Sequence, residues 1–134
     1  MTAVDFSNFV DELATRSGQA IMPFFRSSLA ADDKSAGGVF DPVTEADRAS
    51  EAIMRRMIQE TFPEHGIIGE EYGSHNPEAR HVWVLDPIDG TNNFVRDLPL
   101  WTVSIGAVHG GEAICGVIAA PVLNEISWAA KGQG

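Results

Sequence analysis

Residues 83–94, WVLDPIDGTNNF, combine side chains that could carry out chemistry on a phosphate. An apolar segment delivers Asp86 at its end, and Pro87 predicts a turn that brings Asp89 to the same side. Two carboxylates, with the Ile88 carbonyl nearby, are the oxygen ligands that hard divalent cations such as Mg²⁺ prefer. The stretch therefore predicts a cation site where a strand ends.

Gly90 and Thr91 come next and are expected to open a short helix. The first amides of a helix have no partner within the helix, so a phosphate would bind well there. Without its flanks, the pair Asp86 and Asp89 is more typical of a turn in which Asp89 caps a helix. The strand end, the proline, the carbonyl and the Gly-Thr helix start occur together, and this combination favours the metal interpretation.

Two more acidic clusters lie earlier in the chain. Glu70 and Glu71 follow a short apolar run. If a strand ends there, one acid points to the site and the other away, whereas a solvated loop pair is the alternative. Thr44 and Asp47 have the spacing of a capping box that begins a helix. Because a capping residue can have a second partner, Asp47 is compatible with both roles.

The elements that must position these acids begin with helices. Apolar residues recur at helical spacing over 5–30, and Pro23 is expected to kink this helix or end it early. A polar, Gly-containing loop is expected over 31–40. A second helix then starts at Thr44, and Pro63 closes it.

Strands dominate the second half. Strand candidates occur at 67–68 and, more strongly, at 82–85, followed by a loop and short helix over 87–97. Three more strands, joined by turns into an antiparallel meander, are expected at 102–108, 113–119 and 125–130. Helices followed by a meander, without an internal repeat, predict an α+β fold with helices packed on one face of a mostly antiparallel sheet.

The remaining notable side chains have structural interpretations. The charged residues of the second helix are expected to form a solvated face: Glu51, Arg55, Arg56 and Glu60. The tryptophans lie in strand candidates and are expected in the core: Trp83, Trp101 and Trp128. The histidines share no spacing and are expected on the surface or in loops: His65, His75, His81 and His109. Cys115 stands alone, which excludes an intrachain disulfide, and it is expected to be a buried small hydrophobe.

Composition narrows the class of protein. The chain has 134 residues, of which 44% are hydrophobic and 21% charged, as in soluble globular proteins. It has no apolar run of about 20 residues, and acids replace the positive charges of a signal peptide, so we expect a cytoplasmic protein without a membrane partner. A net charge of −10 argues against a nucleic-acid partner, which requires a basic face. A small phosphorylated ligand is compatible, because metal ions make an acidic site locally positive.

Three segments resemble the inositol monophosphatase family in order and spacing: 41–47 (DPVTEAD), 68–71 (IGEE) and 83–94. The resemblance covers nearly the whole chain. It implies a Mg²⁺-dependent, lithium-sensitive phosphomonoesterase with a layered α-β-α-β-α fold. Family members are about twice this length, and the last four residues read as a turn leading onward. We therefore expect 1–134 to be the N-terminal part of one phosphatase domain, truncated and inactive alone.

The resemblance also implies roles for individual residues. Those implied to hold two Mg²⁺ ions are Glu70, Asp86, the Ile88 carbonyl and Asp89, with Asp86 shared. Those implied to orient the attacking water are Glu70, Thr91 and Asp47. Those implied to bind the substrate phosphate are Asp89, Gly90 and Thr91. A further aspartate ligand and most substrate-selecting residues belong to the half of the family's length that is absent here.

The sequence indicates the substrate less directly than it indicates the family. Residues 14–26, 40–49 and 93–96 are similar to histidinol-phosphatases, whereas residues 103–106 are equally typical of inositol monophosphatases. We expect hydrolysis of histidinol phosphate or inositol monophosphate, with 3′-phosphoadenosine 5′-phosphate or a sugar phosphate as alternatives. A non-catalytic metal-binding half-domain, or a fragment that needs a partner, is the other interpretation. An uncovered strand edge also makes a homodimer possible.

Overall fold

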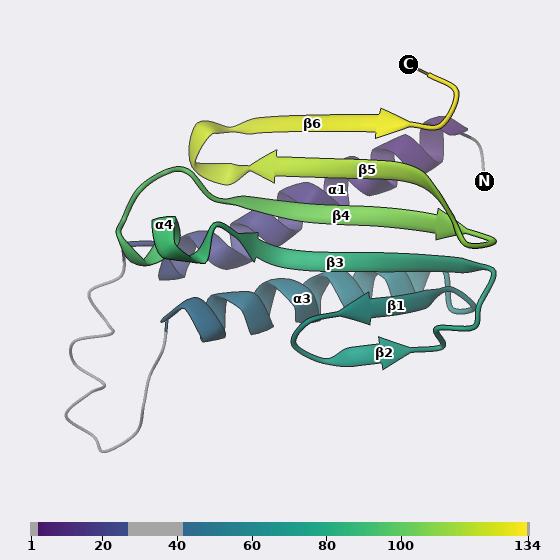
Figure 1. Ribbon diagram of the computed structural model, residues 1–134, viewed down its shortest axis with the longest axis horizontal. Helices are drawn as coiled ribbons and strands as arrows, with labels where there is room; N and C mark the ends of the chain where they lie inside the picture. The colour runs from purple at the N-terminus through teal and green to yellow at the C-terminus, as the bar shows by residue number, and fades with distance from the viewer. Residues whose placement is uncertain (1–2, 27–41, 134) are drawn as a thin grey trace.

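The computed structural model describes residues 3–26 and 42–133. Two long helices, α1 (Ala3–Ile21) and α3 (Pro42–Thr61), lie side by side and cover one face of a six-stranded sheet (Figure 1). This arrangement confirms the predicted α+β class, with the helices on one sheet face. The predicted loop at 31–40 and Asp41 fall outside the described residues. No helix in the described part is long and apolar enough to cross a membrane.

Proline determines where the first helix stops. The α-helix ends at Ile21, and a short 3-10 helix, η1 (Met22–Phe24), follows with Pro23 in its first turn. The proline has no N–H to continue the α-helical ladder, and its ring clashes with the preceding turn. The early end that Pro23 predicted is therefore confirmed.

Helix α3 begins earlier than predicted. Its first residue is Pro42, so Thr44 and Asp47 lie within its first two turns, and the start predicted at Thr44 was late. Proline suits the first helical position, because its fixed φ is already helical and its missing N–H has no partner there anyway. The helix ends at Thr61, shortly before Pro63, as predicted.

The sheet has the strand order β2-β1-β3-β4-β5-β6. Its strands are β1 (Gly66–Gly69), β2 (Gly73–His75), β3 (His81–Asp89), β4 (Thr102–His109), β5 (Glu112–Ala120) and β6 (Glu125–Ala130). Strands β1 and β3 are parallel, and all other neighbours are antiparallel. The meander was predicted from the sequence, with bounds close to those observed. Strand β2 was not predicted, because its Gly-Ser-His sequence carries no apolar pattern.

The turn predicted at Pro87 is not observed, and this prediction was wrong. Strand β3 continues through Pro87 to Asp89, and its pairing with β4 shifts register between Asp86 and Asp89. A bulge of this kind accommodates a proline, which cannot donate to the hydrogen-bond ladder. The short helix α4 (Thr91–Val95) follows, within the range where a loop and helix were predicted.

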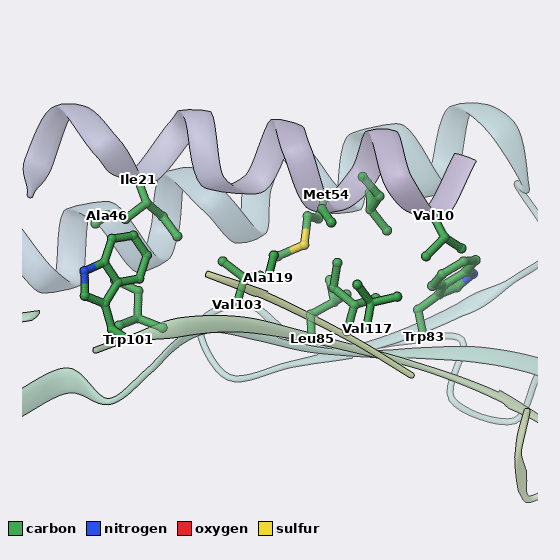
Figure 2. Close-up of a cluster of buried hydrophobic side chains, with 14 of the residues drawn as sticks. Val10, Ile21, Ala46, Met54, Trp83, Leu85, Trp101, Val103, Val117 and Ala119 are labelled. Carbon is green, nitrogen blue, oxygen red and sulfur yellow. The ribbon is translucent and has the colours of Figure 1, made fainter. Parts of the chain in front are cut away.

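The core fills the space between the helices and the sheet. Figure 2 shows side chains from both layers meeting there: Val10, Ile21, Ala46, Met54, Trp83, Leu85, Trp101, Val103, Val117 and Ala119. Alternate residues of β3 point to the other face, where Val84 is 42% exposed. The predicted core positions of Trp83 and Trp101 are thus confirmed.

Two core predictions were wrong. Trp128 is 57% exposed, because β6 is the edge strand and the helices no longer cover the sheet fully there. Cys115 is half-buried and packs against the margin of the core. Both residues lie in the outer part of the meander.

Three of the four histidines gather where β3 begins. The His81 and His109 rings face each other across β3 and β4, with their Nδ1 atoms 3.1 Å apart. The Trp83 indole N–H donates to Nδ1 of His65 over 3.1 Å, and the His65 ring stacks on Phe62. His65 lies in the loop before β1, as predicted, whereas His81 and His109 lie in paired strands, and this pairing brings distant parts of the sequence together.

Burial and neighbouring positive charges favour the neutral forms of His65 and His81. Burial lowers the pKa of His65, and a charge on His81 lowers it further, against a small opposing effect of Glu64. Burial also lowers the pKa of His81, with charges on His109 and Arg80 adding to the effect. The folded chain therefore favours the neutral forms of His65 and His81.

Candidate active site

The parallel pairing of β1 and β3 brings two of the predicted acids to one edge of the sheet. Gly69 pairs with Leu85, so the residues that follow them, Glu70 and Asp86, emerge side by side. Figure 1 shows both strands pointing to the same end of the sheet, where α4 lies and α3 begins. Residues distant in sequence thus meet at the carboxyl ends of two neighbouring strands.

Asp86 occupies the centre of this edge. Burial raises the pKa of its carboxyl group, and the negative charges of Glu70 and Asp89 raise it further. Within the described part of the chain, its Oδ1 atom is buried and has no hydrogen-bond partner. A buried, unpaired carboxylate oxygen is costly and requires an explanation. A cation bound at this atom would supply the missing partner and offset the repulsion among the acids.

Asp47 approaches the same place from α3. Its pKa is raised from 3.8 to about 7, first by burial and then by the negative charges of Glu71, Asp86, Glu70 and Glu51. These effects require the carboxylates to lie close together, although they come from a helix, a turn and a strand. Among the predicted site residues, the structure therefore brings Asp47, Glu70 and Asp86 into one electrostatic cluster.

Glu70 and Glu71 lie in the turn between β1 and β2. The strand ends at Gly69, as predicted. The Glu70 side chain is exposed, while the half-buried Glu71 carboxylate lies 3.9 Å from Nε of Arg48. The negative charges of both acids raise the pKa of Asp47.

The segment after Asp86 contains the buried side chain of Ile88, followed by the turn that starts α4. The Ile88 side chain is buried, while Asp89 at the end of β3 is exposed. Gly90 is the N-cap of α4 and has a φ of 96°, where a side chain is strained. A Cβ at Gly90 would also lie 2.9 Å from the Leu100 carbonyl oxygen. Glycine is therefore the residue that this turn requires.

The start of α4 is open. Its first residue, Thr91, is exposed, and α4 lies against α3, the helix that carries Asp47. The alternative in which Asp89 caps this helix does not hold, because Gly90 is the N-cap and no side chain caps it by a hydrogen bond within the described residues. The first amides of α4 are thus left for another acceptor.

The acids form an open set of ligands and not a closed cage. Over residues 3–26 and 42–133, no three His, Cys, Asp or Glu side chains converge closely enough to enclose a metal ion. Mg²⁺ does not need such a cage, because it keeps several waters and commonly binds one or two carboxylates together with substrate phosphates. The donor set at this edge fits that mode of binding.

One acid beside the site was not predicted from the sequence. Glu51 was assigned to a solvated face, yet its side chain is fully buried, at 0% exposure. Its carboxylate accepts the backbone N–H groups of Glu71 and Tyr72. The signal was present in the sequence, because Glu51 follows Asp47 by one helical turn and precedes Met54 and Ile58 on the buried stripe of α3. Arg55 was assigned to the same face, yet its side chain is only 12% exposed because it pairs with Glu51, whereas the exposed pair of Arg56 and Glu60 fits the prediction.

Known proteins are similar in sequence to this chain over most of its length. The sequence matches the inositol monophosphatase family over residues 4–134. The chain belongs to this family. It is 43% identical to a histidinol-phosphatase of Mycobacterium tuberculosis, in a match that covers 69% of this chain and 36% of that protein. It is 34% identical to inositol monophosphatase 2 of Solanum lycopersicum, over 97% of this chain and 50% of that protein.

A solved inositol monophosphatase has the same fold over the shared length. The structure from Zymomonas mobilis superimposes with a TM-score of 0.81 at 35% identity, covering 98% of this chain and 50% of that one. The chain therefore spans half or less of the length of these members of the inositol monophosphatase family.

Proposed function

We propose that this chain forms the N-terminal part of a Mg²⁺-dependent phosphomonoesterase that hydrolyses the phosphate ester of a small alcohol. The observation that carries the proposal is the buried, unpaired Oδ1 of Asp86, set among Glu70, Asp89 and Asp47 at one edge of the sheet. A buried carboxylate oxygen without a partner lowers the stability of the folded chain. It suits a site that becomes complete on binding a cation.

The residues that would hold Mg²⁺ are Glu70, Asp86, the Ile88 carbonyl and Asp89, in two sites that share Asp86. When bound, Mg²⁺ would polarise the phosphate and lower the pKa of the attacking water. The exposure of Glu70 and Asp89 leaves both carboxylates accessible from solvent. Their charges already act on Asp86, so a cation bound among them would relieve repulsion.

The remaining residues would orient the reacting groups. In this proposal the Thr91 hydroxyl would donate its hydrogen to the Asp47 carboxylate, and the Thr91 oxygen would accept a hydrogen bond from the attacking water. In the metal-free chain, burial and the neighbouring acids raise the pKa of Asp47 to about 7, and a cation bound among those acids would favour the ionised form that accepts this hydrogen bond. The amides of Gly90 and Thr91 donate to the phosphate at the start of α4, where the left-handed Gly90 opens the turn.

The relatives define two candidate substrates. Among them are a histidinol-phosphatase and an inositol monophosphatase, so histidinol phosphate and inositol monophosphate are the proposed substrates of this chain's protein. The higher of the two identities, 43%, belongs to the histidinol-phosphatase, which favours histidinol phosphate. A cytoplasmic location and a homodimer belong to the same proposal.

The test is phosphate release by the protein as its gene encodes it. Histidinol phosphate and inositol 1-phosphate would each be supplied with Mg²⁺ and with a chelator. We expect turnover of at least one substrate that depends on Mg²⁺. Cation binding without turnover of either ester, or of a sugar phosphate or 3′-phosphoadenosine 5′-phosphate, would favour a non-catalytic metal-binding module instead. Assaying the 134-residue chain alone in parallel tests the expectation that it is inactive by itself.

A further inference from the structure

We propose that Glu51 is a positioning residue, which holds the turn carrying Glu70 in the geometry that cation binding requires. The inference rests on the proposed function, because it assigns Glu70 to the cation. It concerns the turn formed by residues 69–73, between β1 and β2, called here the acidic turn. Glu51 itself lies on α3 and does not reach the solvent.

The Glu51 carboxylate binds the middle of the acidic turn with both oxygens. Oε1 accepts the Glu71 N–H over 3.0 Å, and Oε2 accepts the Tyr72 N–H over 2.9 Å. Two successive amides are therefore fixed to one carboxylate. The residue just before them is Glu70, whose backbone is fixed in turn while its side chain stays exposed.

Arg55 binds both Glu51 and the far end of the acidic turn. Its Nε lies 2.9 Å from Oε2 of Glu51, and the Arg55 side chain is only 12% exposed. Its Nη2 donates to the Gly73 carbonyl, and its guanidinium lies 5.8 Å from the centre of the Tyr72 ring. The ion pair therefore joins α3 to the turn through both a carboxylate and a guanidinium.

Gly69 shows how closely the turn fits against Glu51. A Cβ at this position would lie 2.5 Å from both carboxylate oxygens, closer than real side-chain contacts allow. The acidic turn therefore contacts the Glu51 side chain at Gly69, at Glu71 and at Tyr72. Glycine at the start of the turn lets the backbone approach the carboxylate.

A carboxylate is the group that this position needs. Its oxygens only accept hydrogen bonds, and here they meet three N–H donors, from Glu71, Tyr72 and Arg55. Hydrogen bonds to a charged acceptor are stronger than neutral ones, and removing one partner of a buried ion pair leaves the other uncompensated. A glutamine would turn an NH₂ group toward one of the donors.

The link to function lies in the geometry that Mg²⁺ demands. Mg²⁺ tolerates little departure from octahedral coordination, so a ligand on a loose turn binds it poorly. Groups that orient the ligands of a metal site typically contribute 10–100-fold to metal affinity. Glu51 would act in this way without touching the cation or the substrate.

The experiment compares Glu51→Gln with Glu60→Gln in the protein as its gene encodes it. Both changes remove one charge from an i,i+4 pair on α3, but the Glu60 pair is exposed. Without Mg²⁺, amide exchange at Glu71 and Tyr72 should be at least about tenfold faster in Glu51→Gln only. Calorimetric titration should show Mg²⁺ binding about 10–100-fold weaker in the same variant.

A core variant separates positioning from general stability. Ile58→Val removes a methyl group from a fully buried side chain on the same helix, and it should lower the melting temperature while leaving Mg²⁺ affinity unchanged. Should Glu51→Gln fail to fold, Arg55→Lys is the milder test, because it keeps the charge but loses the planar fork. It should weaken Mg²⁺ binding a few-fold.

The outcomes distinguish this inference from the proposed function. An unaltered protein that bound no Mg²⁺ would overturn both. If the unaltered protein bound Mg²⁺ and Glu51→Gln bound it equally well, the function would stand and the positioning role would be overturned. Faster exchange at Glu71 and Tyr72 with unchanged Mg²⁺ affinity would likewise reduce Glu51 to a structural role.

Discussion

Strand β3 carries titratable side chains at both ends, and the two groups are built differently. Where the strand begins, His81 joins His65 and His109 in the histidine cluster, and burial lowers the pKa of His81 and His65. Where the strand ends, burial and neighbouring acids raise the pKa of Asp86 and Asp47. Both ends thus disfavour charge, but only the acidic end carries charges of one sign that lie close together.

The difference lies in what each group can offer its neighbours. A neutral imidazole donates with one nitrogen and accepts with the other, so the histidines and Trp83 satisfy one another. Ionised carboxylates only accept, so the acids cannot satisfy each other. In the described chain, Asp86 Oδ1 is left unpaired in consequence. Of the two ends of β3, the acidic end is therefore the one that needs a donor or cation from outside.

The largest expected effect follows from replacing Asp86. Asp86→Asn should lower phosphatase turnover by at least about 10³-fold, because Asp86 is proposed to serve both cations and outer groups alone contribute 10–100-fold. His81→Gln, at the other end of β3, is the matched control and should change turnover less than about twofold. Phosphate release at saturating Mg²⁺ measures both. Near-normal turnover of Asp86→Asn would refute the two-metal assignment.

Replacing Thr91 is expected to affect turnover but not cation binding. Thr91→Ala should lower turnover by about 10²–10⁴-fold while Mg²⁺ affinity stays nearly unchanged, because Thr91 is proposed to orient water and not to bind the cation. Steady-state kinetics and calorimetry would test the two parts. Thr61→Ala, exposed at the end of α3, is the control. A variant with normal turnover would leave Thr91 as a plain helix start.

The acidic end should also control the pH dependence of stability in Mg²⁺-free protein. The folded-state pKa of Asp47 is about 7, above its ordinary value of 3.8, so the folded chain binds the proton more tightly. The free energy of unfolding should therefore fall as pH rises from about 4 to about 7. Asp47→Asn should remove about 1–2 kcal/mol of this fall. Urea unfolding at several pH values measures it, and an unchanged slope would contradict the crowding of Asp47.

The histidine cluster should show the smallest effect, with opposite sign. The pKa of His81 is lowered from 6.5 on folding, so the unfolded chain binds the proton more tightly. The free energy of unfolding should therefore fall as pH drops below about 6.5. His81→Gln should reduce this loss by less than about 1 kcal/mol, since the ring is only partly buried. If His81→Gln instead steepened the loss, the two ends of β3 would not differ as described.

How much the sequence predicted depended on the distance between the residues involved. The residues from Asp86 to Thr91 are contiguous, so their strand, glycine and helix start could be recognised together. The meander could be recognised because each strand carries its own apolar pattern and is bounded by turns. In both regions the interactions that determine the structure are local.

The residues that were misjudged depend on long-range contacts. Glu51 contacts amides 20 and 21 residues later, and a helical pattern alone cannot show that a turn will supply those donors. His81 and His109 meet across paired strands, 28 residues apart. Trp128 lies in a strand with a good pattern, but its exposure depends on where the helices stop covering the sheet. Sequence periodicity identifies elements, but not which partners these elements meet.

The placement of the tryptophans gives each end of β3 its own optical probe. Figure 2 shows Trp83 and Trp101 at opposite ends of the core. Trp83 is bonded to His65, and Trp101 packs beside Gly90 at the start of α4. The exposed Trp128 can be replaced by phenylalanine with little loss of packing, which leaves two buried emitters. Intrinsic fluorescence would then distinguish protonation of the histidine cluster from cation capture at the acidic end in one unlabelled molecule.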